Sequence, residues 1–144
     1  MPTVNDVLRL KDRRVVYVEV SDTVLQAVKI MNQNRVGAVV VLDQGELAGI
    51  FTERDVLTQI VAAELSPHQT PVASVMTAPV LCCSLSTHIV DVAQTMLTRR
   101  IRHLPVRDAN ELIVGMISIG DINAFNVAQK QATIDNMADY IYGR

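Results

Sequence analysis

The chain has 144 residues and a formal net charge of −2. This balance disfavours a general nucleic-acid binder, because such binding depends on neutralising phosphates with positive charge. Hydrophobic residues make up 49% of the chain and charged residues 19%, which predicts a buried core in one compact unit or two small ones rather than disorder. No apolar run approaches the roughly 20 residues that span a bilayer, and the first residues lack the pattern of a signal peptide. We therefore expect a cytoplasmic protein that does not bind a membrane.

An internal repeat organises the sequence. The run VSDTVLQAVKIMNQNRVGAVVV, which begins at Val20, returns at Leu85 as LSTHIVDVAQTMLTRRIRHLPV. One extra residue in the turn that follows then places the closing motif GIFTERD, from Gly49, on GMISIGD, from Gly115. Apolar positions match apolar positions along both copies, which indicates a duplicated unit.

Each copy is predicted to be a β-α-β-β-α unit. In the first copy, residues 15–20 favour a strand, and the amphipathic helix that follows has an apolar face made by Val24, Val28 and Met31. A β-branched run over 36–42, the turn DQGE and an apolar run over 47–51 predict a hairpin. A helix then begins at GIFTERD. The second copy repeats this order from a strand over 80–85 and a helix whose apolar face holds Ile89, Ala93 and Met96.

The expected helix caps and domain boundaries follow from this order. Ser21 or Asp22 would cap the first amphipathic helix, and Ser86 or Thr87 the second. The run ELSPHQTP over 64–71 is typical of a linker. Because a unit of about 60 residues buries little surface alone, we expect the two sheets to pack together. The prediction is a mixed α/β (α+β) fold with domains at 1–66 and 67–130 and a helical tail at 131–144.

The tail carries a narrow apolar stripe, formed by Ile134, Met137, Ala138 and Ile141. Packing onto the chain's own core and contact with another subunit explain this stripe equally well. The adjacent Cys82 and Cys83 suit neither a disulfide nor a shared metal and are expected to be free thiols. No histidine cluster has metal-ligand spacing, and no serine or cysteine has a nucleophile context, so neither a metal site nor a catalytic site is predicted.

Both closing motifs have chemistry that suits a nucleotide. In GIFTERD, Thr52 is the expected N-cap, and the free N–H groups of a first helical turn favour an anion. Gly49 has no side chain and would allow close approach, while the carboxylate of Asp55 can accept two hydrogen bonds from a vicinal diol such as ribose. The same reasoning applies to Gly115, Ser118 and Asp121.

A hydroxyl followed three residues later by an acid is also the capping-box pattern, which requires no ligand. For one copy alone, capping is the favoured interpretation. Two copies that both keep the hydroxyl, the acid and the glycine weaken that interpretation without removing it, since duplicated structure would preserve duplicated caps. Both interpretations therefore stay open.

Basic residues near the motifs could bind phosphate, because Arg engages two phosphate oxygens at once. Arg54 lies inside the first motif, where a cation opposes the helix dipole and an anion would relieve that conflict. The second motif lacks an internal Arg and would need Arg100, Arg102 or His103 from its own hairpin strand. Each Arg could instead be a solvated surface residue, and His103 a packed strand histidine.

The tandem copies, their closing motifs, MTAPV over 76–80 and RHLPV over 102–106 together resemble CBS (cystathionine-β-synthase) domains. The resemblance covers about residues 5 to 130 and is strongest to small bacterial stand-alone CBS pairs. It implies two domains with pseudo-twofold symmetry, nucleotide clefts between them and a homodimer. It also implies that the motif hydroxyl and Asp contact ribose and phosphates, and that adenine lies beside positions matched here by Val16, Tyr17, Val80, Leu81 and Pro105.

The sequence therefore predicts a non-catalytic regulatory module that binds an adenine nucleotide (AMP, ADP or ATP, with AMP favoured), needs no cofactor and acts on an unidentified partner protein. A structural or assembly module with empty clefts is the main alternative, and NAD or S-adenosylmethionine are alternative ligands. An enzyme acting on the bound nucleotide is disfavoured, because a base, a nucleophile and metal ligands are missing.

Overall fold

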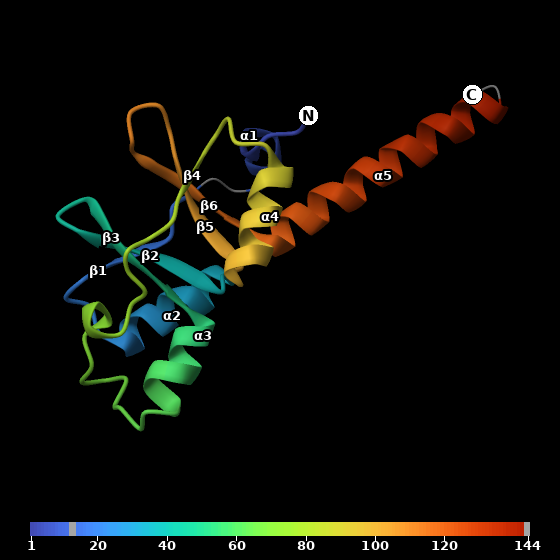
Figure 1. Ribbon diagram of the computed structural model, residues 1–144. Helices are drawn as coiled ribbons and strands as arrows, with labels where there is room; N and C mark the ends of the chain where they lie inside the picture. Colours follow the sequence, from blue (N-terminus) through green and yellow to red (C-terminus); the bar gives the residue numbers. More distant parts are fainter. Residues whose placement is uncertain (12–13, 143–144) are drawn as a thin grey trace.

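Two small sheets lie side by side in the computed structural model, which describes residues 1–11 and 14–142 (Figure 1). Their strand orders are β1-β2-β3 and β4-β5-β6. In both sheets the first strand runs parallel to the second, and the second pairs antiparallel with the third. The predicted duplication and the mixed fold class are thus confirmed by matching topology.

The first unit holds six elements, in chain order β1 (Tyr17–Glu19), α2 (Val24–Asn34), β2 (Ala38–Asp43), β3 (Glu46–Thr52), α3 (Glu53–Asp55) and the π-helix η1 (Val56–Val61). The second unit follows the same order with five elements, β4 (Cys83–Ser84), α4 (Ile89–Arg99), β5 (His103–Arg107), β6 (Ile113–Ser118) and α5 (Ile119–Tyr142), in which α5 takes the place of α3 and η1. Both predicted hairpins are present. The two leading strands are shorter than predicted, because only three residues of the first and two of the second pair with the hairpin.

In both amphipathic helices the N-cap position lies one residue after the last predicted candidate. Thr23 caps α2, because its hydroxyl accepts a hydrogen bond from Gln26 N at 3.2 Å. The prediction of Ser21 or Asp22 is therefore wrong, and the Asp22 carboxylate instead accepts a backbone hydrogen bond inside the preceding turn.

In the second unit, α4 follows His88, whose side chain makes no capping hydrogen bond. The prediction of Ser86 or Thr87 is also wrong. The Thr87 hydroxyl accepts a hydrogen bond from Ser84 N at 3.1 Å and so stabilises the turn before the helix.

Each amphipathic helix ends at an arginine in the left-handed backbone conformation. Arg35 has φ 54° at the end of α2, and Arg100 has φ 56° at the end of α4. Left-handed residues other than glycine are uncommon, so this agreement shows that the two copies match even in an unfavourable backbone detail. Both arginines stand where the chain turns from the helix into the hairpin.

Each hydrophobic core is completed by a segment that precedes the other copy's first strand. The short helix α1 (Val4–Leu8) buries three apolar side chains in the core of the second unit. In return, the 3-10 helix η2 (Val72–Ser74) packs with Val75 into the core of the first unit. The packing therefore crosses the boundary between 1–66 and 67–130, which stays a prediction, because each unit packs a segment from the other side of it.

The helix α5 runs without a break from the second motif to Tyr142 and extends away from the body of the molecule (Figure 1). Ile122 and Phe125, near its start, are buried, whereas Ile134 and Ile141 are 58% and 67% exposed. The apolar stripe of the predicted tail is thus not packed on the chain's own core. Within residues 1–11 and 14–142, no helix has both the length and the hydropathy of a membrane span.

Candidate functional site

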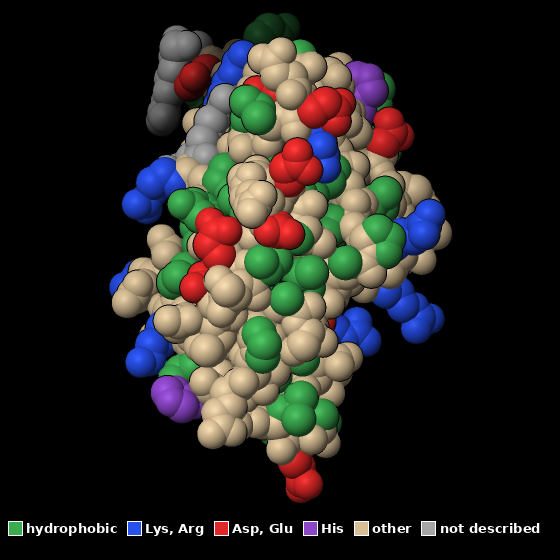
Figure 2. Space-filling view, turned by 90° about the vertical axis from the view of Figure 1, so that its left-hand side faces the viewer, with side chains coloured by type: hydrophobic (Ala, Val, Ile, Leu, Met, Phe, Trp, Pro, Cys, Tyr) green, Lys and Arg blue, Asp and Glu red, His purple; other side chains and the backbone are tan. Residues whose placement is uncertain are grey.

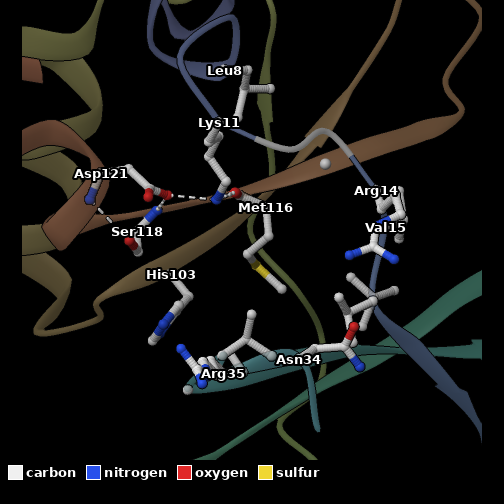
Figure 3. Close-up of a pocket in the computed structure, with 16 residues that line it drawn as sticks. Leu8, Lys11, Arg14, Val15, Asn34, Arg35, His103, Met116, Ser118 and Asp121 are labelled. Atoms are coloured by element: carbon white, nitrogen blue, oxygen red, sulfur yellow. Dashed lines mark hydrogen bonds and ion pairs between the residues drawn. The ribbon is translucent and has the colours of Figure 1, made fainter. Parts of the chain in front are cut away.

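Two clefts lie between the units, one at each closing motif. The first cleft has a volume of about 660 Å³ and is lined by Thr52, Arg54, Asp55, Thr77, Arg100 and Arg102, among others. The second cleft has a volume of about 350 Å³ and is lined by Lys11, Val16, Arg35, Gly115, Ser118 and Asp121, among others (Figure 3). In both, the motif of one copy faces the start of the hairpin in the other copy. The clefts are therefore composite, and neither copy forms one alone.

The first motif is a complete capping box. Thr52 N donates a hydrogen bond to Asp55 Oδ2 at 3.0 Å, and Asp55 N donates to Thr52 Oγ1 at 3.2 Å. The capping interpretation is thus confirmed for this copy. A carboxylate has about four acceptor positions, so the cap leaves Asp55 with capacity for further donors. One of them is the Thr77 hydroxyl, which donates to Asp55 Oδ1 at 3.2 Å.

The second motif repeats this capping geometry. Ser118 N donates to Asp121 Oδ2 at 2.9 Å, and Asp121 N donates to Ser118 Oγ at 3.0 Å. Its acid also has a charged partner, because Lys11 Nζ lies 2.8 Å from the same Asp121 oxygen. The two motifs are therefore alike as caps and different as candidate ligand sites.

Three arginines converge on the first cleft. Arg54 comes from the motif itself, and Arg100 and Arg102 come from the start of the second copy's hairpin. Within the described part of the chain, none of the three makes an ion pair with a carboxylate. Uncompensated guanidinium groups around a hollow favour an anion, above all a phosphate.

This arrangement corrects one prediction. Arg100 and Arg102 were expected to serve the second motif, yet they line the first cleft and not the second. The reason is that the hairpin of one copy faces the motif of the other. Arg35, the counterpart of Arg100, accordingly lines the second cleft, and His103 lines both.

The motif glycines serve packing more than ligand approach. A Cβ on Gly49 would lie 2.6 Å from Met76 Sδ and 2.9 Å from Thr77 O. The missing side chain thus makes room for the segment after η2, and the expected approach of a ligand at Gly49 stays a prediction. Gly115 does line the second cleft, but its Cβ would lie 3.3 Å from Leu8 Cδ1, so α1 also approaches it closely.

The residues expected beside adenine are only partly brought together. Val16 lines the second cleft, opposite the other copy's motif. Tyr17, half exposed in β1, Val80, half-buried, and Pro105, buried in β5, line neither cleft. Successive residues of a strand point to opposite sides, so Val16 and Tyr17 could not both face one hollow.

Burial shifts the pKa of two residues, His103 at the clefts and Cys83 in β4. It lowers the pKa of His103, and the nearby carboxylates of Asp121 and Glu53 oppose this shift only in part. Burial also raises the pKa of Cys83 to about 12, which keeps this thiol protonated and unreactive. Cys82 and Cys83 are both free and half-buried, as predicted. Among the described residues, no group of three or more His, Cys, Asp or Glu could hold a metal ion.

Lys11 is one of the cleft residues that the sequence did not reveal. It lies before the first repeat, so no matched position in the second copy drew attention to it. Its only signal was a basic character shared with neighbouring residues in LKDRR.

On the face in Figure 2, acidic side chains gather in the upper half, while Lys and Arg lie mostly toward the edges. The described residues of this face therefore do not form the continuous basic surface that nucleic-acid binding needs.

The chain is similar to known proteins that contain CBS domains. A family model for the CBS domain matches residues 4–62 and 72–126. The CBS domain-containing protein CBSX3, mitochondrial, of Arabidopsis thaliana is 36% identical over 150 residues, which cover 98% of this chain and 72% of the relative. A solved protein with CBS domains from Burkholderia ambifaria has a TM-score of 0.85 and 36% identity, covering 88% of this chain and 95% of its own.

One less similar protein of known structure was solved as a complex with a ligand. The CBS domain protein PAE2072 from Pyrobaculum aerophilum, complexed with AMP, has a TM-score of 0.74 and 24% identity, covering 83% of this chain and 89% of its own. At this identity the likeness shows the fold alone. With two matched units, two composite clefts and these relatives, the chain belongs to the CBS domain family, as a tandem pair of CBS domains.

Proposed function

We propose that the protein is a non-catalytic regulatory module that binds an adenine nucleotide, with AMP as the favoured ligand, in the first cleft. The observation that carries this proposal is the convergence of Arg54, Arg100 and Arg102 on a cleft of about 660 Å³ that also contains the Asp55 carboxylate. A nucleotide needs both features, a cationic group for phosphate and an acceptor for the ribose diol. The AMP complex of PAE2072 supports the proposal, since a protein of the same fold accommodates this ligand.

The orientation of the ligand follows from the charges. The phosphate would lie at the start of α3, within reach of the arginines, where it also relieves the conflict between Arg54 and the helix dipole. The ribose hydroxyls would donate to Asp55, whose cap leaves acceptor positions open. Thr52 would hold the helix start in place and offer its hydroxyl to the phosphate.

Binding would be signalled through the relative position of the two CBS domains. Arg54 and Asp55 belong to one copy and Arg100 and Arg102 to the other, so a ligand that contacts all four favours one spacing between the copies. A partner protein that prefers this spacing would then respond to the nucleotide, because a ligand shifts an equilibrium only through differential affinity for its states.

We further propose that the protein forms a homodimer. The stripe of Ile134, Met137 and Ile141 on α5 supports this, because all three side chains are more than half exposed on a helix that extends from the body. Exposed apolar residues on one helix face are typical of a subunit contact.

Thermal unfolding in the presence of AMP, ADP, ATP, NAD and S-adenosylmethionine tests the ligand proposal. A ligand at 100 times its dissociation constant should stabilise the protein by roughly 2.7 kcal/mol. The shift should vanish in Asp55→Ala and persist in Asp43→Ala, which removes an exposed carboxylate of the first hairpin. No shift with any of the five compounds, or a shift that survives Asp55→Ala, would contradict the proposal.

The second candidate function is an assembly module whose motifs serve only as caps, and the two complete capping boxes favour it. Thr52→Ala distinguishes the two functions, with Thr52→Ser as the matched control that keeps the hydroxyl. A pure cap predicts a loss of about 1 kcal/mol in the free energy of unfolding and no nucleotide effect in any variant. A nucleotide site predicts that Thr52→Ala also weakens AMP binding beyond its effect on stability.

A further inference from the structure

The acids of the two clefts have different partners. In the second cleft, Lys11 Nζ donates to Asp121 Oδ2 at 2.8 Å and to Met116 O at 2.9 Å (Figure 3). In the first cleft, the matching acid Asp55 accepts from the neutral Thr77 hydroxyl at 3.2 Å. A charge-assisted hydrogen bond is shorter and roughly twice as strong as a neutral one, so Asp121 is held much more firmly than Asp55.

The repeat shows that these contacts occupy equivalent places. Thr77 N donates to Ile50 O at 2.8 Å, and Ile50 matches Met116 in the repeat. Lys11 therefore makes, with one ammonium group, both contacts that Thr77 makes with its backbone N–H and its hydroxyl. The difference between the clefts at this point is a full positive charge beside the second acid.

Lys11 is fixed in this position by the exchanged segment. Its N–H donates to Leu8 O at 3.3 Å, and Leu8 is 1% exposed in the second core. The side chains of Lys11 and Asp121 are 34% and 22% exposed. An ion pair with this degree of burial is screened less than a pair on the open surface.

We propose that Lys11 closes the second cleft to nucleotides by occupying the carboxylate that a ribose diol would need, so that the chain binds one nucleotide, in the first cleft. This inference rests on the proposed function. A vicinal diol that donates to both carboxylate oxygens would compete with Lys11 for Asp121 Oδ2, and a neutral hydroxyl cannot match that charge-assisted bond. The smaller volume of the second cleft, about 350 Å³ against about 660 Å³, points the same way.

Calorimetric titration of the full chain with AMP tests this inference. The wild-type protein should bind one AMP per chain, and Asp55→Ala should abolish that binding. Lys11→Met keeps the length of the side chain without the charge and should open a second site, at least about tenfold tighter than any second-site binding in the wild type. Adding Asp121→Ala to Lys11→Met should remove the second site again.

Two controls separate charge from general perturbation. Lys11→Arg keeps the cation and should keep one AMP per chain, and Lys130→Met, on an exposed part of α5, should behave as the wild type. If Lys11→Met melts at a much lower temperature than the wild type, Lys11→Gln replaces it in the same titration.

The outcomes distinguish this inference from the function on which it rests. Two AMP per wild-type chain, or weaker binding in Lys11→Met, would overturn the role of Lys11 and leave the proposed function standing. No binding to the wild type with one Asp121-dependent site in Lys11→Met would support the role of Lys11 and contradict the function of the first cleft. No AMP binding to either protein would overturn both.

Discussion

Thr52 and Asp55 combine a structural role with a proposed ligand role. Their reciprocal hydrogen bonds at 3.0 and 3.2 Å hold the start of α3, and both residues line the first cleft together with the three arginines. A cap with geometry fixed before the ligand arrives reduces the ordering cost of binding. Capping and ligand binding, which the sequence leaves as alternatives, are therefore compatible in this cleft.

At Gly49, any side chain would displace backbone. Gly49→Ala would put a Cβ 2.9 Å from the Thr77 carbonyl oxygen as well as against Met76, so we expect a loss of about 1–3 kcal/mol in the free energy of unfolding. Gly120→Ala is the matched control, because its Cβ would have 3.6 Å to its nearest neighbour. Urea unfolding of both variants measures the difference. Equal stability of Gly49→Ala and the wild type would show that Gly49 is not needed for packing.

His103 should make the fold less stable in acid. Burial lowers its pKa in the folded state below the usual 6.5, so its contribution to stability is complete above pH 6.5 and is lost as the pH falls from there toward the folded-state pKa. His103→Gln should therefore lose less stability than the wild type between about pH 7.5 and about pH 5.5. Urea unfolding across this range gives the comparison, and identical pH profiles would contradict the assignment.

Sequence reasoning found the motif residues because their chemistry is local. Thr52 and Asp55 are three residues apart, so spacing alone predicts their hydrogen bonds. The partners across the clefts are not local. Lys11 and Asp121 are 110 positions apart, and nothing in the composition around Lys11 indicates which carboxylate it will meet.

Among the elements, η1 and α5 depart furthest from the simple repeat. After α3 the chain continues as a π-helix, in which Ala62 N donates to Leu57 O and Leu65 N donates to Ile60 O. This wider turn leaves Leu57 at the mouth of the first cleft, 63% exposed. Hydrophobic periodicity predicts a helix here but not its type. A π-helix has about one residue more per turn than an α-helix, which changes which side chains face inward.

The stripe on α5 should determine the oligomeric state. We expect Ile134→Asp combined with Ile141→Asp to convert a dimer into a monomer, because charges on an apolar contact oppose its burial. Size-exclusion chromatography with light scattering gives the mass, and thermal unfolding should show that the body stays folded. Asn136→Asp, at a polar position off the stripe, is the control. A doubly substituted protein with the mass of the wild-type dimer would exclude this contact.

Over the whole molecule, the exchange of α1 and η2 ties the two CBS domains together. Val4 and Leu8 are 0% and 1% exposed in the second core, and Val72 is 0% exposed in the first. Neither domain therefore has a complete core without the segment that precedes the other copy's first strand. This packing makes the relative position of the domains part of the fold, so the proposed ligand between them would act on that position.

The repeat predicts the two units, their hairpins and their closing motifs, but not how the units face each other. Sequence similarity between copies is the same whether a motif faces its own hairpin or the other copy's. For this reason Arg100 and Arg102 were matched with the wrong motif, and the exchange of α1 and η2 was not foreseen. Only the three-dimensional arrangement shows that the clefts are composite.

The most direct test of the central claim is a crystal structure of the protein grown with saturating AMP. The prediction is one AMP in the first cleft, with its ribose hydroxyls within hydrogen-bonding distance of the Asp55 carboxylate and its phosphate against Arg54, Arg100 or Arg102. A first cleft without nucleotide at saturating AMP, or AMP bound only outside the two clefts, would contradict it.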